Sequence, residues 1–331
     1  MSRPPLKPYE LKRLLERRKP MTICIAAMCQ QDEDNDEPRI VLCYDWKAEQ
    51  EYGASETSDK MRDLPNNWVA LMAGDMPRAE ELVAQYETHL RSFKEAVDDA
   101  ELFTEMKKPA RKQKENLATD YIWQTMGVSY ADLVSPDKKF PESIVELRLN
   151  EVAQIRLRAT LIIAGFAATN QGEELRKRLP YIFVVDDQDN HQDVVRPEEN
   201  FAAIGNGSYV AIPALHQREQ QDDMPLMQTI YNVMEAKKLS QVVPGVGEAT
   251  ELDVLYPDGR LMRWSESLYQ RLNKLFKKLG PTLELSEKES KQLFEFRDEY
   301  LLPIDEDEKP GEKSKDTRIK RSVSQNPEQA Q

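Results

Sequence analysis

Short apolar runs of strand length alternate with polar turns in the part of the chain that follows residue 21. Residues 22–28 (TICIAAM) and 39–44 (RIVLCY) are rich in β-branched and other apolar side chains, and the acidic segment QQDEDNDEP lies between them. A charged segment that contains proline predicts an exposed turn. A second pair of runs, residues 60–64 and 68–73, is joined by a Pro-Asn-Asn sequence. We therefore expect two β-hairpins.

The apolar periodicity then changes from that of strands to that of helices. Pro77 lies in the first turn of an expected helix whose apolar positions continue to about residue 98, and a second helix is expected over residues 143–157. Residues 99–142 between them hold a basic stretch, an aromatic patch and prolines. We interpret this less regular segment as an insertion.

The second half of the chain repeats the order of strands followed by helices. Strands are expected over residues 159–166, 181–186 and 252–256, and helices are expected to begin near Ser208 and Pro225. Grouped strands followed by grouped helices favour an α+β layered sandwich over a parallel sheet built from βαβ units. No internal repeat is evident.

Both ends of the chain differ from this central part, residues 22–264. Residues 1–21 form a basic leader, and residues 265–302 predict two amphipathic helices that form a C-terminal appendage. Residues 303–331 contain no aromatic side chain, which favours a disordered tail.

Composition and charge exclude several classes of function. The chain has 331 residues and a formal net charge of −13, which disfavours a general nucleic-acid binder. No apolar run reaches the 18 residues of a membrane span, and the basic leader lacks the apolar core of a secretory signal. Three cysteines and three histidines show no Cys-x-x-Cys or His-x-x-x-His spacing, so we expect no metal and no cofactor. Buried, reduced thiols indicate a cytoplasmic protein.

The two hairpins bring polar residues together. A first turn centred between residues 33 and 34 places Asp45 directly across from Thr22. A second turn centred between residues 66 and 67 places Lys60 across from Ala73, beside Gly74. A hydroxyl, a carboxylate, an ammonium group and a backbone N–H then meet at one end of a sheet.

Each of these residues also has a structural interpretation when it is taken alone. A threonine at a strand start is nearly always structural, and Asp45 could be a turn residue at a strand end. Lys60 could be a solvated charge on a strand, and Gly74 a tight junction between a strand and a helix. The combination is what favours catalysis.

The same segments resemble a known family. TICIAAM…IVLCYDWKA…SDKMRDLPNNWVALMAGDMPRAEEL resembles the opening of a proteasome β-subunit and is similar to HslV-type and ancestral-β-subunit peptidases. LIIAGF, YIFVVD, AIGNGSYVAIPAL and LDVLYPDG resemble the second half of that family in order, so the resemblance covers residues 21–264 without 99–142. It implies the four-layer αββα sandwich of the N-terminal nucleophile hydrolases, with an inserted segment.

The resemblance also implies a catalytic mechanism. Thr22 would be the nucleophile, and its own α-amine, with a reference pKa of about 7.7–8.0, would be the base. Lys60 would lower the pKa of that amine and stabilise the alkoxide, and Asp45 would orient Lys60. The N–H of Gly74 would donate to the oxyanion of the tetrahedral intermediate.

Weaker matches extend the implied site. Lys47 and Ala48 lie where the family pairs a peptide substrate as an added strand, and Met72 would shape an apolar specificity pocket. Asn206 takes the place of a serine that active members carry beside the nucleophile. The last loop departs from the family pattern, because the chain reads VPGVGE (residues 243–248) where members have Asp and Ser before Gly-Gly.

Catalysis of this kind needs a free amine on Thr22. Residues 1–21 are therefore expected to be a removed propeptide, or translation starts at Met21 and methionine removal exposes Thr22. The resemblance implies peptide or unfolded protein substrates, a homo-oligomeric ring and an ATP-dependent unfoldase partner. Three hypotheses remain: a cytoplasmic threonine endopeptidase, a catalytically inactive structural subunit, and an amidase of the same nucleophile class.

Overall fold

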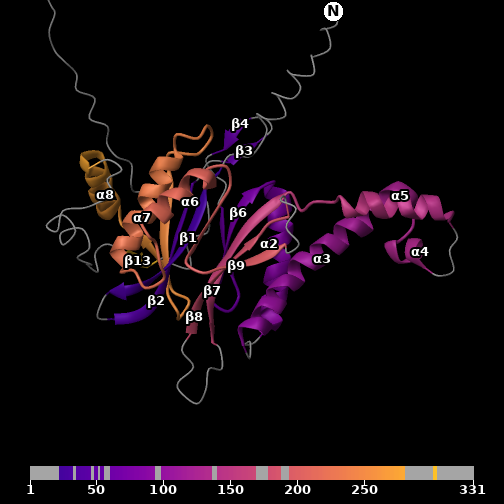
Figure 1. The fold of residues 1–331 in the computed structure, drawn as a ribbon, viewed down its shortest axis with the longest axis horizontal. Coiled ribbons are helices and arrows are strands. Elements are labelled where there is room, and N and C mark those ends of the chain that lie inside the picture. Colours follow the sequence, from indigo (N-terminus) through magenta and orange to yellow (C-terminus); the bar gives the residue numbers. More distant parts are fainter. Residues whose placement is uncertain are drawn as a thin grey trace, which may run out of the picture.

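The fold is a mixed α+β architecture built around two antiparallel sheets (Figure 1). The computed structural model describes residues 22–32, 35–45, 48–50, 53–55, 60–93, 98–135, 140–168, 178–187, 194–279 and 301–303. The expected α+β class is confirmed, because every pairing between the named strands is antiparallel.

The first sheet has six strands and the second has five. In spatial order the first sheet consists of β10 (Phe201–Ile204), β1 (Cys24–Asp32), β2 (Asn35–Asp45), β11 (Thr250–Leu255), β12 (Leu261–Trp264) and β13 (Leu301–Pro303). The second consists of β5 (Met61–Leu64), β6 (Trp68–Gly74), β7 (Ala159–Ala168), β8 (Arg178–Val185) and β9 (Val195–Glu198). A separate small hairpin joins β3 (Ala48–Gln50) to β4 (Gly53–Ser55).

Three apolar cores follow from the alternation of side chains along the strands. In β1, Cys24 and Ala26 face the second sheet, whereas Ile25 and Ala27 face helices on the other side. The helices on that outer face are α6 (Ser208–Gln217), α7 (Leu226–Ser240) and α8 (Glu266–Leu279). The outer face of the second sheet packs against α2 (Met76–Ser92) and the first half of α3 (Asp99–Met126). The two sheets thus lie between two layers of helices.

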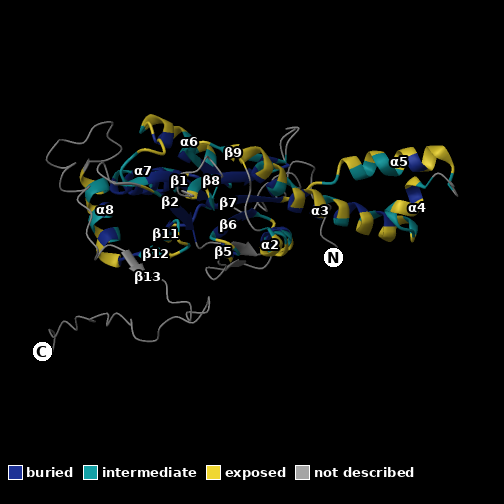
Figure 2. Cartoon of the chain, turned by 90° about the horizontal axis from the view of Figure 1, so that it is seen from below, coloured by how far each residue is buried: buried dark blue, intermediate teal, exposed yellow. Residues whose placement is uncertain are grey.

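A helical arm projects from this body (Figures 1 and 2). It consists of the second half of α3 together with α4 (Tyr130–Val134) and α5 (Glu142–Ala153), and it encloses a small core of its own. The body is the remainder of the described chain.

Residues 99–142 are more regular than expected, and their being an insertion stays a prediction. Residues 99–126 form one helix, which Asp98 caps at its start and Gly127 ends in a left-handed conformation (φ 67°). Leu102 and Met106 of this helix are fully buried against the second sheet and α2. The segment therefore supplies both core side chains of the body and the base of the arm.

The two expected hairpins exist, but both registers differ from the expected ones by one residue. Ile25 pairs with Cys43, which continues to Ile23 beside Asp45, so Asp45 is not directly across from Thr22. A register shift between Gln30 and Asp32 accounts for the difference.

The second hairpin differs because its turn contains three residues, Pro65 to Asn67, between the paired Leu64 and Trp68. Asn66 and Asn67 both adopt positive φ, which asparagine tolerates better than most residues. Lys60 consequently lies across from Met72 rather than Ala73, and the Met72 N–H donates to the Lys60 carbonyl oxygen at 2.8 Å.

The C-terminal appendage is partly described. Its first helix, α8, buries Leu268 and Leu272 in the core of the first sheet, so this apolar face is used within the chain. The expected second helix, the tail and the leader lie outside the described residues, apart from the short strand β13. Strands β12 and β13 were not expected. None of the described helices combines the length and apolar content that a membrane span needs.

Candidate functional site

The candidate site lies at one edge of the sandwich, where several strands begin or end. Thr22 comes just before β1, Asp45 ends β2, Lys60 comes just before β5, and Gly74 ends β6. Because neighbouring strands are antiparallel, the start of one strand lies beside the end of the next. The topology therefore brings all four residues, singled out from the sequence, to the same edge.

Three of these side chains are in direct contact. The Thr22 hydroxyl donates to Asp45 Oδ1 with an Oγ1–Oδ1 distance of 2.6 Å. Lys60 Nζ donates both to Thr22 Oγ1 and to Asp45 Oδ1. The exposed fractions are 2% for Thr22, 0% for Asp45 and 2% for Lys60. The hydroxyl thus lies between a carboxylate and an ammonium group that bulk water does not screen.

The second oxygen of Asp45 is held separately. The Gly247 N–H donates to Asp45 Oδ2 at 2.8 Å, and the Asp45 N–H donates to the Ile23 carbonyl oxygen at 3.3 Å. Hydrogen bonds to both carboxylate oxygens fix the rotation of the side chain. Asp45 is therefore oriented before any substrate binds.

A glycine-containing turn before α6 holds the backbone of Thr22. The Gly207 N–H donates to the Thr22 carbonyl oxygen at 3.2 Å, and Ser240 Oγ donates to the Gly207 carbonyl oxygen at 3.1 Å. A Cβ on Gly205, whose φ is 88°, would lie 2.4 Å from the Thr22 carbonyl oxygen. Asn206 lies between these two glycines and hence beside Thr22, and its part in the chemistry stays a prediction.

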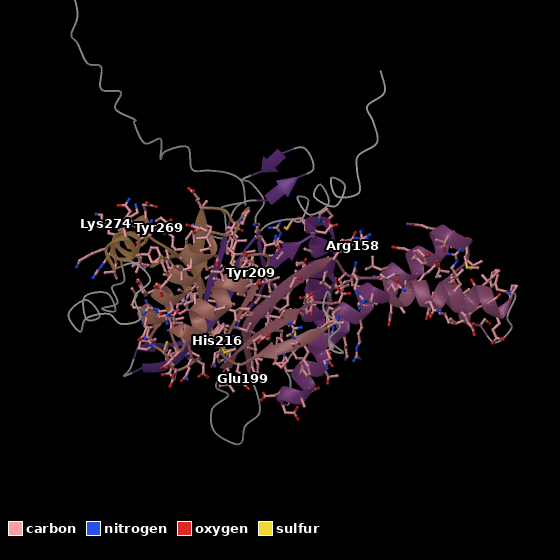
Figure 3. The ribbon with its side chains drawn as sticks, turned by 45° about the horizontal axis from the view of Figure 1, so that its top comes forward. Arg158, Glu199, Tyr209, His216, Tyr269 and Lys274 are labelled. Atoms are coloured by element: carbon pink, nitrogen blue, oxygen red, sulfur yellow. The ribbon has the colours of Figure 1, made fainter. Side chains whose placement is uncertain are left out.

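Gly74 forms the junction between β6 and α2. Its φ is 96°, and a Cβ there would lie 2.8 Å from the Arg158 carbonyl oxygen, so only glycine fits without movement. That carbonyl accepts the Asp75 N–H at 2.9 Å, and Asp75 caps α2. Arg158, labelled in Figure 3, lies where the chain returns from the arm to β7. The role of the Gly74 N–H as an oxyanion donor stays a prediction.

Of the three residues proposed for substrate binding, the structure describes the side chain of Met72 alone. Met72 is fully buried in the core between the second sheet and its helices, so a role in a specificity pocket stays a prediction. Lys47 lies outside the described residues. Ala48 opens β3 in the small separate hairpin, and its side chain is also outside the described set.

Sequence reasoning missed two residues that contact this site, Gly247 and Lys237. Gly247 lies in the VPGVGE loop, which was noted only for its departure from the family pattern. Lys237 Nζ donates to the Gly247 carbonyl oxygen at 2.6 Å, and burial lowers the pKa of this lysine. One signal was present in the sequence: Lys237 follows Ile230 by seven residues, the spacing of one helix face.

The three thiols are buried and free. Cys24 follows Thr22 by two residues, and its Sγ lies 3.4 Å from the Met72 carbonyl oxygen. Burial raises the pKa of Cys24 to about 12, so its thiol stays protonated near neutral pH and is a poor nucleophile. Within the described ranges, no group of three or more His, Cys, Asp or Glu side chains could hold a metal ion.

No protein-family model matches the chain, and no curated protein matches it. A hydroxyl that donates to a carboxylate and accepts from an ammonium group can lose its proton and have the resulting alkoxide stabilised.

Proposed function

We propose that the chain is a threonine-type peptidase whose nucleophile is the hydroxyl of Thr22. The observation that carries the proposal is the contact of the Thr22 hydroxyl with both Asp45 Oδ1 and Lys60 Nζ in a site closed to bulk water. Two sheets between two helical layers also fit the αββα sandwich of the N-terminal nucleophile hydrolases, the fold that the sequence resemblance implies.

The reaction begins when Thr22 has become the first residue of the mature chain. Its α-amine, with a reference pKa of about 7.7–8.0, accepts the hydroxyl proton, and Oγ1 attacks the substrate carbonyl carbon. The C–N bond then breaks, the leaving amine takes the proton, and water hydrolyses the acyl ester in a second step. Lys60 stabilises the alkoxide, and Asp45 holds Lys60 and the hydroxyl in register.

The oxyanion of the tetrahedral intermediate needs a donor of its own. In this proposal the Gly74 N–H supplies it, and one such donor is worth about 2.7–4 kcal/mol in other hydrolases. The positive φ of Gly74 and its position after β6 support the assignment, because they turn the backbone at the edge that holds Thr22. Peptide or unfolded protein substrates, a homo-oligomeric ring and an ATP-dependent unfoldase belong to the same proposal.

The decisive experiment identifies the residue that an electrophile modifies. The purified full chain is sequenced from its N-terminus, treated with a peptide epoxyketone or vinyl sulfone, and analysed by intact and peptide mass. We expect a chain that starts at Thr22 and carries one adduct there. Thr22→Ala should abolish the adduct and any peptide hydrolysis, whereas Thr88→Ala, at an exposed threonine of α2, should change neither. Hydrolysis that survives Thr22→Ala would exclude this nucleophile.

A second candidate is a catalytically inactive subunit of the same fold. The departure of the VPGVGE loop and the 2% exposure of Thr22 favour it. An intact peptide bond between Met21 and Thr22 in the assembled protein, with no adduct, would support this candidate. Turnover of a small amide without peptide cleavage would instead support an amidase.

A further inference from the structure

Lys237 is a fully buried lysine on α7, on the helical side of the first sheet. Its exposed fraction is 0%, although lysine is almost never buried without a partner. The hydrogen bond from Nζ to the Gly247 carbonyl oxygen, at 2.6 Å, joins α7 to the loop that precedes β11. A lysine in this position has a defined partner, and that partner is backbone.

The groups that act on Lys237 electrostatically come from three parts of the chain. Cys43 and Asp45 lie on β2, Lys60 lies before β5, and Lys238 is its neighbour on α7. Burial lowers the pKa of Lys237, and the nearby Asp45 carboxylate opposes that change. Asp45 therefore lies in the field of two lysines, Lys60 and Lys237.

Gly247 connects Lys237 to the carboxylate. Its carbonyl oxygen accepts from Lys237, and its N–H donates to Asp45 Oδ2 at 2.8 Å. The other carboxylate oxygen, Oδ1, is the one that contacts Thr22 and Lys60. A continuous chain of polar contacts thus runs from α7 through the loop to the proposed nucleophile.

We propose that Lys237 is a positioning residue of the Thr22 site, which fixes residues 243–247 so that Gly247 holds Asp45 in its working orientation. Its effect on the reaction rests on the proposed function, whereas its hold on the loop does not. The VPGVGE loop offers no acidic side chain before Glu248, so in this chain a lysine from a helix and a backbone N–H organise this side of the site.

The neighbouring lysine provides a matched control. Lys238 lies on the same helix, and its Nζ donates to the Tyr269 hydroxyl at 3.1 Å and lies over the same ring, whereas the Nζ of Lys237 donates to Gly247. Tyr269 is among the residues labelled in Figure 3. Lys238→Met removes an equal charge and a similar hydrogen bond without touching the loop.

The test compares Lys237→Met, Lys237→Gln and Lys238→Met in the full chain. Hydrogen exchange over residues 243–248 is measured together with the rate of epoxyketone labelling at Thr22. We expect Lys237→Met to raise the exchange rate about 10- to 100-fold, as loss of a buried charged hydrogen bond implies. The same variant should slow labelling. Lys237→Gln, whose amide can still donate to the carbonyl, should restore most of the protection, and Lys238→Met should leave both readouts unchanged.

A pH profile of labelling separates positioning from a purely structural role. In the proposed reaction Lys60 favours the neutral amine of Thr22, and Asp45 holds Lys60. A loosened loop that no longer fixes Asp45 should therefore move the acid-side midpoint of labelling in Lys237→Met to higher pH. Equal slowing at every pH, or unchanged exchange over 243–248, would overturn the proposal. If Lys237→Met does not fold, hydrogen exchange over residues 243–248 is compared between Lys237→Gln and wild type. The proposal then requires that the exchange rates of the two proteins be close. If wild type is not labelled, the proposed function is wrong. The hydrogen-exchange result alone then tests whether Lys237 holds residues 243–247 in place.

Discussion

The body and the arm use apolar side chains in opposite ways. In the body, three large clusters fill the spaces within and around the two sheets. The arm's own core has three buried apolar side chains, Ile122, Leu133 and Val145, and the arm carries four of the six large apolar residues that are exposed in the described chain. Polar contacts such as Tyr121 Oη to Glu151 Oε2 at 2.7 Å add to its small core.

This difference indicates which region must hold the residues of the proposed site in fixed positions. The proposed site depends on backbone positions at strand ends, and those positions are set by the packed cores of the body. The arm has a core of its own, so we expect it to open without disturbing the strands. Helix α3 belongs to both the body and the arm. A structural change transmitted between these two regions would therefore pass through the middle of this helix.

The largest expected effect comes from breaking the buried pair in the body. Lys60→Met leaves Asp45 buried without its cation, and such losses cost about 3–5 kcal/mol in the free energy of unfolding. Chemical denaturation should show this loss, and labelling of Thr22 should disappear. Lys114→Met is the matched control, because Lys114 is about one third exposed where it pairs with Asp187 at 3.1 Å. Equal losses in both variants would contradict the special role of the Lys60–Asp45 pair.

A smaller effect is expected from the core of the arm. Ile122→Ala removes a fully buried side chain, a change that typically costs about 2–5 kcal/mol. We expect this cost to appear as faster hydrogen exchange over residues 118–153, with Thr22 labelling within about twofold of wild type. Ile162→Ala, at an equally buried position between the sheets, should instead lower the stability of the whole body. A global loss from Ile122→Ala would mean that the arm and the body unfold together.

The smallest effect concerns His89, which lies where α2 meets α3. Its Nε2 lies 3.2 Å from Glu105 Oε2, and burial lowers the pKa of His89 while Glu105 opposes that shift. Because the folded pKa is below the unfolded value of about 6.5, the unfolded chain takes up the proton first as pH falls. The contribution of His89 to the free energy of unfolding is therefore complete above the unfolded pKa of about 6.5 and is lost as the pH falls below it.

His89→Gln should remove this part of the pH dependence. Unfolding measured between pH 7.5 and pH 5 should show a smaller loss of stability for His89→Gln than for wild type. His216→Gln, on α6 and away from α3, is the control and should follow wild type. An unchanged slope for His89→Gln would show that Glu105 cancels the effect of burial.

Much of the fold could be predicted from local patterns. The strands β1, β2, β6 and β7 each contain an apolar run of strand length, and such a run bounded by turn residues predicts a buried strand. The registers were wrong because a shift near Gln30 and a three-residue turn depend on backbone conformation. Helix α3 was missed because lysines lie between its buried positions and a proline, Pro109, occupies one of them.

The residues of the candidate site also fall into those that the sequence predicts and those that it does not. Thr22, Asp45, Lys60 and Gly74 lie at strand ends that the sequence marks, so their convergence could be predicted despite the register errors. Gly247 and Lys237 could not be placed in this way, because their contacts join segments far apart in sequence and depend on the packing of α7 against the first sheet. A buried lysine also looks like any other charged residue near the end of a helix.

The register shift between Gln30 and Asp32 has a practical consequence for protein engineering. It lies at the opposite end of the β1–β2 pair from Asp45, and from Cys24↔Tyr44 to Gln30↔Pro38 the pairing is regular. A peptide tag or a fluorophore attachment sequence added after the shift, near residues 33 and 34, would leave that ladder unaltered. The acidic segment between Asp32 and Asn35 is therefore the position at which to graft a reporter without displacing Asp45.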